Sequence, residues 1–565
     1  MITDFDIHGA SQRLAVRHRL TDGSICGRVY DLASGHLVGE IGSQFLPQGL
    51  RFSPNGSQVS FFGDGSLYIY DIPQQAVVVA FHAPALHAGF CDWSPSGDAL
   101  VFSAYPLDEK AHPPDIYVLD LPTQGVTQLT DTADVDRYPQ WSPSGDYIAF
   151  QRQSVEDAGR RTRIHVVQIK TGRSTTCAAH PAASYTLGRG CWMSHAPQLL
   201  AIEHVDRETR LVVLDATNGQ VIARREPADL IGVVRGSHGH AALGDSSTAV
   251  VAFSLPRLSP RGQVALPDGV RLLQRQLGPA VILQENDGVM YWVGSDHTLY
   301  QWVDGQGHRT LLRDPHPVPA FSHEEYAVRS ADGRLIPTHR LIPPHPKQMA
   351  VVYVIGGPGA SIDLEDPILL RLVAEGYEVI CPAHRGQSGY GHEHQEANRG
   401  EYGLADVWDV VAAAQDWQQR TPCQRPVAVM GFSYGGYLTF LSLAATDVWA
   451  CGISLWGVTR LEYLGMHRAR AYPQDPSQQQ EARVMRSPVM QASRIRAPLL
   501  MLHAGLDTTS TTADVQTIQA RVEASGVPCQ LVVYNVDTHG LQRHRPEMFA
   551  EILRFLDGHA MNDVR

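Results

Sequence analysis

The sequence predicts two domains of different fold class, an all-β repeat domain over residues 1–315 and an α/β domain over residues 316–565. Three observations predict this division. A strand-rich pattern recurs at nearly regular spacing in the first half, the pattern stops near residue 315, and alternating strands and helices follow it. A chain of 565 residues is also too long for one ordinary hydrophobic core.

The repeated pattern of the first half encodes a hairpin. An aromatic residue and Ser-Pro lead into a turn that contains Gly, and an apolar strand follows. Because Pro fixes φ and Gly tolerates a tight turn, these residues favour a hairpin locally. Ser53, Ser94 and Ser142 mark successive copies, which are 41 and 48 residues apart. The three copies are RFSPNGSQVSFF (51–62), DWSPSGDALVFS (92–103) and QWSPSGDYIAFQ (140–151).

This spacing predicts a β-propeller. Such periods are typical of propeller blades or of solenoids, and each period here holds several short strands and no helical stretch. A weaker copy, CWMSHAPQLLAIE, occupies 191–203; one blade precedes the first copy, and two degraded blades follow residue 235, the last ending in TLYQWV. These segments give about seven blades and leave six or eight open. The alternative fold for this half is a β-sandwich.

The second half alternates apolar strands with helices. Its helical segments include LLRLVAEG and ADVWDVVAAAQDWQQR, and its expected strands include AVVYVIGG, YEVICPAH, PVAVMGF, ACGISLWG, PLLMLHAG and CQLVVYNV. Continuous runs of Val, Ile and Leu separated by helices indicate a mostly parallel sheet.

A Gly-x-Ser-x-Gly motif lies in this second half, at Gly431-Phe432-Ser433-Tyr434-Gly435. The motif alone recurs by chance, but here it directly follows the strand PVAVM and precedes the apolar helix YLTFLSLAA. This strand–turn–helix context is the one in which the motif forms the nucleophile elbow of an α/β-hydrolase. The sequence therefore predicts an α/β-hydrolase domain with Ser433 as its nucleophile.

A serine hydroxyl becomes a nucleophile when a neighbouring base takes its proton. In α/β-hydrolases the triad follows the order Ser, Asp or Glu, then His. Asp507 lies just beyond the strand in LLMLHAGLD, and His539 lies just beyond the next strand in VVYNVDTHG. We expect His539 to transfer the proton and Asp507 to fix its tautomer. The competing residues are Asp514 and Asp537, both expected to be surface charges, His503 within a strand, and His544 in a polar segment.

The oxyanion formed on attack needs two hydrogen-bond donors that are already in place. We expect one to be the backbone N–H of Tyr434, directly after the nucleophile. The second is expected from the Gly-rich turn in VYVIGGPGA, where Gly357 or Gly356 can bring its N–H close because no side chain intervenes. The alternative is that this turn is only a tight connection.

Composition and charge restrict the expected partners and compartment. The net charge of −12 argues against a nucleic-acid surface. No basic segment followed by an apolar stretch opens the chain, and no apolar run of about 18 residues occurs, so we expect neither secretion nor a membrane span. The eight cysteines lack CxxC spacing, which favours free thiols in the cytoplasm over a disulfide framework or a metal site.

The motifs together resemble the prolyl oligopeptidase family of serine peptidases. A repeat domain with SPSGD hairpins precedes the hydrolase domain, and the motifs of the second domain follow in the family's order. Two of them, GFSYGGY and RGQSGYG, are more similar to the acylaminoacyl-peptidase and dipeptidyl-peptidase branches. The matching segments are SADGRLIP (330–337), IGGPG (355–359), HRGQSGYG (384–391), GLADVWD (403–409), GFSYGGY (431–437), MRSP (485–488), HAGLD (503–507) and THG (538–540).

The resemblance implies a propeller over the hydrolase mouth that admits only short or unfolded peptides, and cleavage through an acyl-enzyme on Ser433 without metal or cofactor. Gly357 and Tyr434 would supply the oxyanion N–H groups. Arg486 would hold oxygen atoms of the substrate, with Arg483 as its rival and a structural ion pair as the alternative. The family usually has His before the GGP turn, where this sequence has Ile355.

Two other functions stay open at this stage. The same acyl-transfer chemistry serves an esterase or amidase that acts on a small-molecule or pathway-specific substrate. A vestigial hydrolase whose propeller binds a partner is the third hypothesis, and the complete Ser, Asp and His set argues against it. We expect a short peptide or a small acylated substrate, no nucleic acid and no membrane, and a homo-oligomer is compatible with the sequence.

Overall fold

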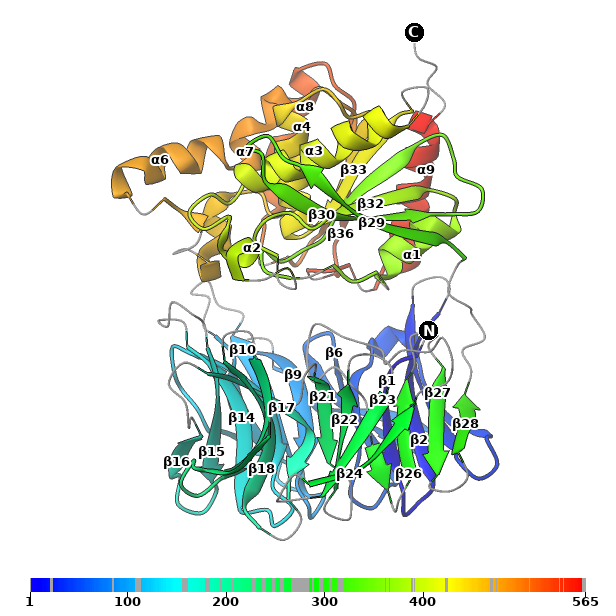
Figure 1. Cartoon of the computed structure of the whole chain (residues 1–565), viewed down its shortest axis with the longest axis vertical. Helices are drawn as coiled ribbons and strands as arrows, with labels where there is room; N and C mark the ends of the chain where they lie inside the picture. Colours follow the sequence, from blue (N-terminus) through cyan, green and yellow to red (C-terminus); the bar gives the residue numbers. More distant parts are fainter. Residues whose placement is uncertain are drawn as a thin grey trace. The chain divides into compact units, whose positions relative to one another are not determined.

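The chain forms two compact units in a computed structural model, one of residues Met1–Thr21 and Ile25–Pro317, the other of Asp22–Ser24 and Val318–Arg565. The first unit is all-β and the second is α/β (Figure 1). The structure describes residues 2–560 except 21–23, 84–85, 107–112, 155–160, 178–182, 194–195, 206–207, 226–229, 236–239, 246–248, 255–258, 266–283, 287–288, 294–297, 304–306, 313–319, 361, 365, 388–389, 391, 422–424, 468–470, 474, 508, 538 and 542.

The described part of the first unit contains seven four-stranded antiparallel sheets, each made of consecutive strands. The predicted β-propeller is confirmed, and seven is the number of its described sheets. The sheets comprise β1 (Ile2–His8), β2 (Arg13–Arg19), β3 (Ile25–Asp31) and β4 (Leu37–Ile41); β5 (Gln48–Phe52), β6 (Gln58–Gly63), β7 (Ser66–Asp71) and β8 (Ala76–Phe81); β9 (Leu86–Trp93), β10 (Ala99–Pro106), β11 (Asp115–Asp120) and β12 (Val126–Gln128); β13 (Val135–Trp141), β14 (Tyr147–Gln153), β15 (Thr162–Gln168) and β16 (Ser174–Cys177); β17 (Ser184–Trp192), β18 (Gln198–Val205), β19 (Glu208–Asp215) and β20 (Val221–Arg225); β21 (Leu230–Arg235), β22 (His240–Asp245), β23 (Ala249–Ser254) and β24 (Ser259–Ala265); and β25 (Gln284–Asn286), β26 (Val289–Val293), β27 (Leu299–Val303) and β28 (Gly307–Leu312).

The Ser-Pro repeat forms the turn between the first two strands of the second, third and fourth sheets. In the third sheet, the Ser94 hydroxyl accepts the N–H of Ala99 at 3.0 Å, and the N–H of Gly97 donates to the Ser94 carbonyl at 2.9 Å. Gly97 has φ +78°, in the left-handed region that favours glycine. The same bonds recur around Ser53 and Ser142, so the repeated letters encode one repeated hydrogen-bonded turn.

Side-chain packing joins the first sheet to the last. Ile2, Phe5 and Leu14 of the first sheet form one buried cluster with Leu299 of β27, and Leu311 of β28 packs against it. No strand of the described residues is exchanged between these sheets, so hydrophobic contact closes the ring. The expected end of the last blade was wrong by one strand, because β28 follows the TLYQWV strand.

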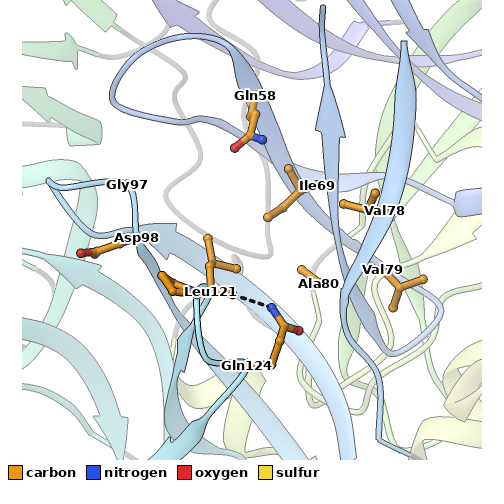
Figure 2. A pocket seen from close by; sticks show the side chains of 10 residues that line it. Gln58, Ile69, Val78, Val79, Ala80, Gly97, Asp98, Leu121 and Gln124 are labelled. Atoms are coloured by element: carbon orange, nitrogen blue, oxygen red, sulfur yellow. Dashed lines mark hydrogen bonds between the residues drawn. The ribbon is translucent and has the colours of Figure 1, made fainter. Parts of the chain in front are cut away.

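One open pocket of about 700 Å³ lies on the propeller unit (Figure 2). Its only charged lining residue is Asp98, whose carboxylate accepts the Ser94 and Ser96 hydroxyls at 2.9 and 2.5 Å. The one carboxylate of this lining is thus engaged by two hydroxyl groups of the turn. It consists of Gln58, Ile69, Val78, Val79, Ala80, Gly97, Asp98, Leu121, Pro122 and Gln124.

The second unit is built on an eight-stranded sheet in the order β29-β30-β32-β31-β33-β34-β35-β36. The pairs from β32 to β36 are parallel, and the hairpin β29–β30 extends the sheet antiparallel at one edge. Every residue of β31, β32, β34 and β35 is buried, as expected of central strands covered on both faces. The strands are β29 (Ser322–Arg329), β30 (Leu335–Ile342), β31 (Ala350–Val354), β32 (Glu378–Pro382), β33 (Val427–Phe432), β34 (Cys451–Leu455), β35 (Leu499–Ala504) and β36 (Cys529–Tyr534).

Helices pack on this sheet around a continuous apolar core. The core joins side chains of β31, β33 and β35 to those of α3, α4 and α8. Helices α1 and α9 also meet, because the guanidinium of Arg371 in α1 lies 6.0 Å from the ring centroid of Phe549 in α9. The helices are α1 (Pro367–Ala374), α2 (His392–Glu396), α3 (Ala405–Arg420), α4 (Tyr434–Ala445), α6 (Pro476–Met485), α7 (Pro488–Gln491), α8 (Thr512–Ala524) and α9 (Arg545–Ala560), with 3-10 segments at Leu461–His467 and Ala492–Arg494.

Two sequence expectations concern the whole chain. Within the described residues, no helix combines the length and the apolar character that crossing a membrane requires. The cysteines described by the structure are free, and Cys423 lies outside the described residues.

Candidate active site

Ser433 occupies a strained turn between β33 and α4. Its backbone has φ 54° and ψ −117°, a conformation that costs a non-glycine residue on the order of 1–3 kcal/mol. Small neighbours make the turn possible. A Cβ added at Gly435 would lie 2.0 Å from the Val354 carbonyl oxygen, and one added at Gly431 would lie 2.4 Å from the Gly435 carbonyl oxygen. The glycines of the motif are therefore required by close packing of the backbone around the serine.

The structure brings Ser433, His539 and Asp507 together in one hydrogen-bonded chain. His539 Nε2 lies 2.9 Å from the Ser433 hydroxyl oxygen, and His539 Nδ1 lies 2.9 Å from Asp507 Oδ2. Because a carboxylate can only accept, Nδ1 carries the ring proton and Nε2 is left to accept the serine proton. This arrangement can turn a hydroxyl into a nucleophile and later return the proton to a leaving group.

Asp507 is fixed by backbone donors on its other oxygen. Asp507 Oδ1 accepts the N–H groups of Thr509 at 2.7 Å and Ser510 at 3.3 Å, and the Asp507 side chain is fully buried. His503, a competing histidine, contacts the same segment through Ser510: its Nε2 lies 3.2 Å from the Ser510 carbonyl. Burial lowers the pKa of His503, which favours a neutral ring. The carboxylate is thus held in place from behind while it orients the imidazole.

The loop that carries His539 is closed by a second acid–imidazole pair. The Asp537 carboxylate lies 2.6 Å from His544 Nδ1 and accepts the N–H of Arg543 at 3.1 Å. The Asp537 carbonyl also accepts the N–H of Leu506, the neighbour of Asp507, at 3.0 Å. The expectation that Asp537 is a surface charge was wrong, because it is only 2% exposed.

Asp514 is the second residue that was expected at the surface and is buried, at 5% exposure. Arg460 binds both of its carboxylate oxygens at 2.7–3.0 Å, and the Thr459 hydroxyl donates to it at 3.2 Å. Burial acts to raise the pKa of this carboxyl group, but its hydrogen bonds and the charge of Arg460 together lower it below the ordinary value. Asp514 therefore ties α8 to the segment after β34, and no bond joins it to His539 among the described residues.

The expected oxyanion donors belong to two segments, the start of α4 and the turn that follows β31. Tyr434 is the first residue of α4, and the first N–H groups of a helix have no partner within it. Gly357 has φ +73°, which favours glycine. At Gly356 the requirement is space, because an added Cβ would lie 2.5 Å from the ring of Phe432. The turn at 356–357 is thus packed against the residue that precedes the serine.

Comparison with known proteins adds a decisive observation to this geometry. Residues 367–563, which hold the Ser433, Asp507 and His539 chain, match the model of the prolyl oligopeptidase family. These residues belong to the prolyl oligopeptidase family. The resemblance inferred from the motifs is therefore confirmed for this domain.

Curated relatives of this prolyl oligopeptidase domain are similar over part of their length. Dipeptidyl peptidase family member 6 of Caenorhabditis elegans is 28% identical over 224 residues, which are 37% of this chain and 30% of that protein. Dipeptidyl aminopeptidase BIII of Pseudoxanthomonas mexicana is 30% identical over 187 residues, which are 30% of this chain and 27% of that protein. The chain thus spans less than a third of the length of these two relatives.

Solved structures share the fold over almost the whole chain. A puromycin-hydrolyzing peptidase of Mycobacterium tuberculosis has a TM-score of 0.77 at 16% identity, covering 99% of this chain and 94% of its own. The acylaminoacyl peptidase of Pyrococcus horikoshii has a TM-score of 0.68 at 15% identity, covering 100% and 96%. The predicted combination of a propeller and an α/β-hydrolase domain is confirmed by these likenesses of fold.

Arg486 of the prolyl oligopeptidase domain is engaged with backbone. Its Nη1 donates to the Gly400 carbonyl at 2.7 Å, and its own carbonyl accepts the Tyr437 hydroxyl at 2.7 Å. It lines a pocket of about 480 Å³ together with residues of α3, α4 and α6. The rival Arg483 lies over the Tyr472 ring at 5.6 Å. Among the described residues, no hydrogen bond or ion pair joins either arginine to the triad residues.

Sequence reasoning missed two contacts close to the elbow of this prolyl oligopeptidase domain. Asp406 lies in the first turn of α3, where its carboxylate accepts the N–H groups of Gly403 and Val407 at 3.0 Å. It also accepts the hydroxyl of Tyr434, directly after the nucleophile. Burial raises the pKa of Asp406 to about 6. An acidic residue at a helix start does not by itself reveal which distant hydroxyl it will accept.

Trp456 is the second missed residue. It follows β34, with φ 37° and its N–H bonded to the Leu502 carbonyl at 2.7 Å. Its ring is edge-on to His539 at 6.5 Å and tilted against Phe432 at 5.9 Å. The Arg545 guanidinium lies 5.2 Å from the ring centroid of Trp456. The only sequence signal was an aromatic residue at the end of a buried strand in the same sheet.

Histidine-rich segments supply no further site in the described part of the chain. There, no group of three or more His, Cys, Asp or Glu side chains lies close enough to hold a metal ion. In the segment GHEHQE, His394 Nε2 lies 3.1 Å from the His384 carbonyl, so this histidine is part of the packing.

Proposed function

We propose that this chain is a serine peptidase that cleaves short peptides through an acyl-enzyme on Ser433. One observation carries the proposal: His539 lies 2.9 Å from both the Ser433 hydroxyl and the buried Asp507 carboxylate. The strained backbone of Ser433 supports it, because strain of this kind is retained where the surrounding structure holds a residue for function.

The chemistry would proceed in two balanced steps. Ser433 Oγ attacks the scissile carbonyl carbon while His539 Nε2 takes the hydroxyl proton, and the N–H groups of Tyr434 and Gly357 hold the resulting oxyanion. Collapse of the intermediate breaks the C–N bond, and His539 delivers its proton to the leaving amine. A water molecule, deprotonated by His539, then attacks the acyl carbon; the bond to Ser433 Oγ breaks, the acid leaves, and His539 returns the proton to Ser433 Oγ. Asp507 stabilises the imidazolium throughout.

The relatives support peptides over esters as the substrate class. The curated relatives of the domain carry peptidase names, and the solved structures of the same fold include an acylaminoacyl peptidase. The same triad could also hydrolyse small esters or amides. The geometry of the triad does not distinguish a peptidase from an esterase, so a comparison of substrates is needed.

Active-site labelling and a substrate panel test the proposal. A fluorophosphonate probe should modify the intact protein, and Ser433→Ala should abolish the labelling while leaving the urea unfolding curve of the protein close to that of wild type. Initial rates are then compared for an acylated aminoacyl anilide, a free-amino dipeptidyl anilide and a nitrophenyl ester. Cleavage of either anilide is expected. Turnover of the ester alone would instead favour the esterase, and labelling that persists in Ser433→Ala would overturn the choice of nucleophile.

A further inference from the structure

Arg545, at the start of α9, is a cation to which the described part of the chain gives no bonded partner. Its side chain is partly buried, and its guanidinium lies 5.2 Å from the ring centroid of Trp456. Among the residues that the structure describes, none gives this guanidinium a hydrogen bond or an ion pair. Burial lowers the pKa of Arg545, and the charges of Asp366, Tyr353 and Asp537 act against that shift. Stacking on an aromatic face is one of the few contacts that stabilise the cation here.

The carboxylates near Arg545 are bound by other groups. Asp366 caps α1 by accepting the N–H groups of Ile368 and Leu369, and it also accepts the Tyr353 hydroxyl at 2.9 Å. Asp537 binds His544 and a backbone N–H within the His539 loop.

Two other arginines of the same unit have a structural role, because carboxylates of the fold bind their guanidinium groups. Arg385 is bound by Asp332 and Asp409, and Arg460 is bound on two oxygens of Asp514. Both have their N–H donors directed at carboxylates of the fold. Arg545 instead keeps its planar set of donors available for a ligand that brings its own carboxylate.

The stacked pair of Arg545 and Trp456 lies beside the general base. Trp456 is edge-on to His539 with ring centroids 6.5 Å apart. Because His539 would protonate the leaving group, the leaving group must lie next to its imidazole. The two spacings keep the guanidinium within about 12 Å of that ring, a span that a leaving group of about three extended residues covers at roughly 3.5 Å per residue.

We propose that Arg545 binds the terminal carboxylate of a short leaving group, so that the protein prefers peptides cut within about three residues of a free C-terminus. This inference rests on the proposed peptidase function. The ligand class is a carboxylate, which a guanidinium recognises through two parallel N–H···O bonds. Trp456 acts as the platform that holds the guanidinium flat, and truncation of the ring should therefore weaken the same preference.

Matched peptides test the inference. N-acylated peptides with one, two, three and six residues after the scissile bond are prepared as free acids and as C-terminal amides, and kcat/KM is measured from the products by mass spectrometry. Wild type should prefer the acid over the amide by about 10-fold or more for the short leaving groups, the strength expected of a hydrogen bond to a charged group. The six-residue pair should show little preference.

Variants of Arg545 assign the preference to its side chain. The acid-to-amide ratio should fall to about one in Arg545→Gln and should be partly kept in Arg545→Lys, because Lys retains the charge without the planar fork. Arg554→Gln is the matched control, an exposed arginine on the same helix that is paired with Glu551, and its ratio should equal that of wild type. Added salt should lower the acid-to-amide ratio of wild type more than that of Arg545→Gln, because salt screens the attraction between the guanidinium and the carboxylate.

The outcomes are distinguishable. If the acid-to-amide ratio of wild type is near one, or if Arg545→Gln has the same ratio as wild type, Arg545 does not bind the carboxylate. The proposed peptidase function is unaffected by either result. An amide peptide that regains its rate through a Glu in the leaving group would show that a side-chain carboxylate is the natural ligand instead of the terminus. If wild type is labelled by the fluorophosphonate and cleaves none of these peptides, the proposed function fails and the inference falls with it. If Arg545→Gln does not fold, the wild-type ratio and Arg545→Lys decide.

Discussion

The propeller turns and the nucleophile elbow both depend on glycine, for different physical reasons. In the Ser-Pro turns, Gly97 and Gly145 have positive φ, and an added Cβ would meet its nearest atom at 3.5 and 3.9 Å, which is ordinary contact. At the elbow, a Cβ on Gly431, Gly435 or Gly436 would lie 2.0–2.6 Å from backbone atoms. Local backbone conformation selects glycine in these two turns, whereas contact between distant segments selects it at the elbow. Substitution of Gly97 or Gly145 should therefore cost less than substitution at the elbow.

Gly435→Ala should have the largest effect. The new methyl group would lie 2.0 Å from the Val354 carbonyl, so β31 and α4 must separate. We expect a loss of about 3 kcal/mol of unfolding free energy and a fall of at least about 100-fold in the fluorophosphonate labelling rate, because the serine is displaced. Urea unfolding and labelling kinetics measure the two effects. A variant that labels like wild type would show that the strands move apart easily.

Protonation of buried carboxylates should affect both units in the same direction. Burial raises the pKa of Asp92 in the propeller and of Asp406 beside the elbow to about 6, above the 3.8 of an unperturbed carboxyl. The folded state therefore binds a proton that the unfolded state releases between about pH 4 and pH 6, and stability from each group falls as pH rises through that window.

Asparagine at either position removes this titration. For the fully buried Asp406 the effect is on the order of 2 kcal/mol, seen as a flatter dependence of the urea midpoint on pH in Asp406→Asn than in wild type. Asp92→Asn should flatten the transition of the propeller unit in the same way. Parallel pH curves of wild type and variant would mean that the carboxyl group titrates normally.

Gly97→Ala should have a moderate effect confined to the propeller. A left-handed residue with a side chain costs about 1–2 kcal/mol, and the space around Gly97 is open enough for a methyl group. The unfolding midpoint should fall while the labelling rate of Ser433 stays unchanged. A lower labelling rate would reveal that the turn communicates with the hydrolase unit, which the comparison does not predict.

Ser433→Gly should show the smallest effect on stability and the opposite sign. Glycine adopts φ 54° without the strain that serine bears there, so unfolding free energy should rise by about 1 kcal/mol as labelling is lost. Ser433→Ala, which keeps a side chain in the same conformation, is the matched control and should not gain stability. Equal stabilities of the two variants would argue that the elbow is not strained.

Short sequence motifs predicted the parts of the molecule whose conformation is set by residues close together in the chain. The Ser-Pro-Gly letters were sufficient for the hairpins because the hydroxyl, the carbonyl and the glycine of each turn lie within five residues. The chain order of Ser433, Asp507 and His539 was sufficient to select three side chains that the structure brings within hydrogen-bonding distance. The strand β28, with the weakly patterned sequence GHRTLL, carried no such signal and was missed.

Burial of charge was the main failure of sequence reasoning, because partners are set by the tertiary structure. Asp514 lies in the first turn of α8, and only the fold brings Arg460 to it from 54 residues away. Asp537 is buried because His544, seven residues later, returns to it at the end of a loop. Trp456 and Arg545 meet across two elements, so neither residue alone indicates the stacked pair.

The closure of the propeller has a consequence for how this unit can be rearranged. Each described sheet consists of consecutive strands, and the first and last sheets meet through the side chains of Ile2, Phe5 and Leu299 rather than through shared strand hydrogen bonds. The junction between them is therefore made by side-chain packing, as is the junction between the second and third sheets. Circular permutation that moves the chain ends to the connection between β8 and β9 should leave a ring of the same seven sheets, with its seam at a new position.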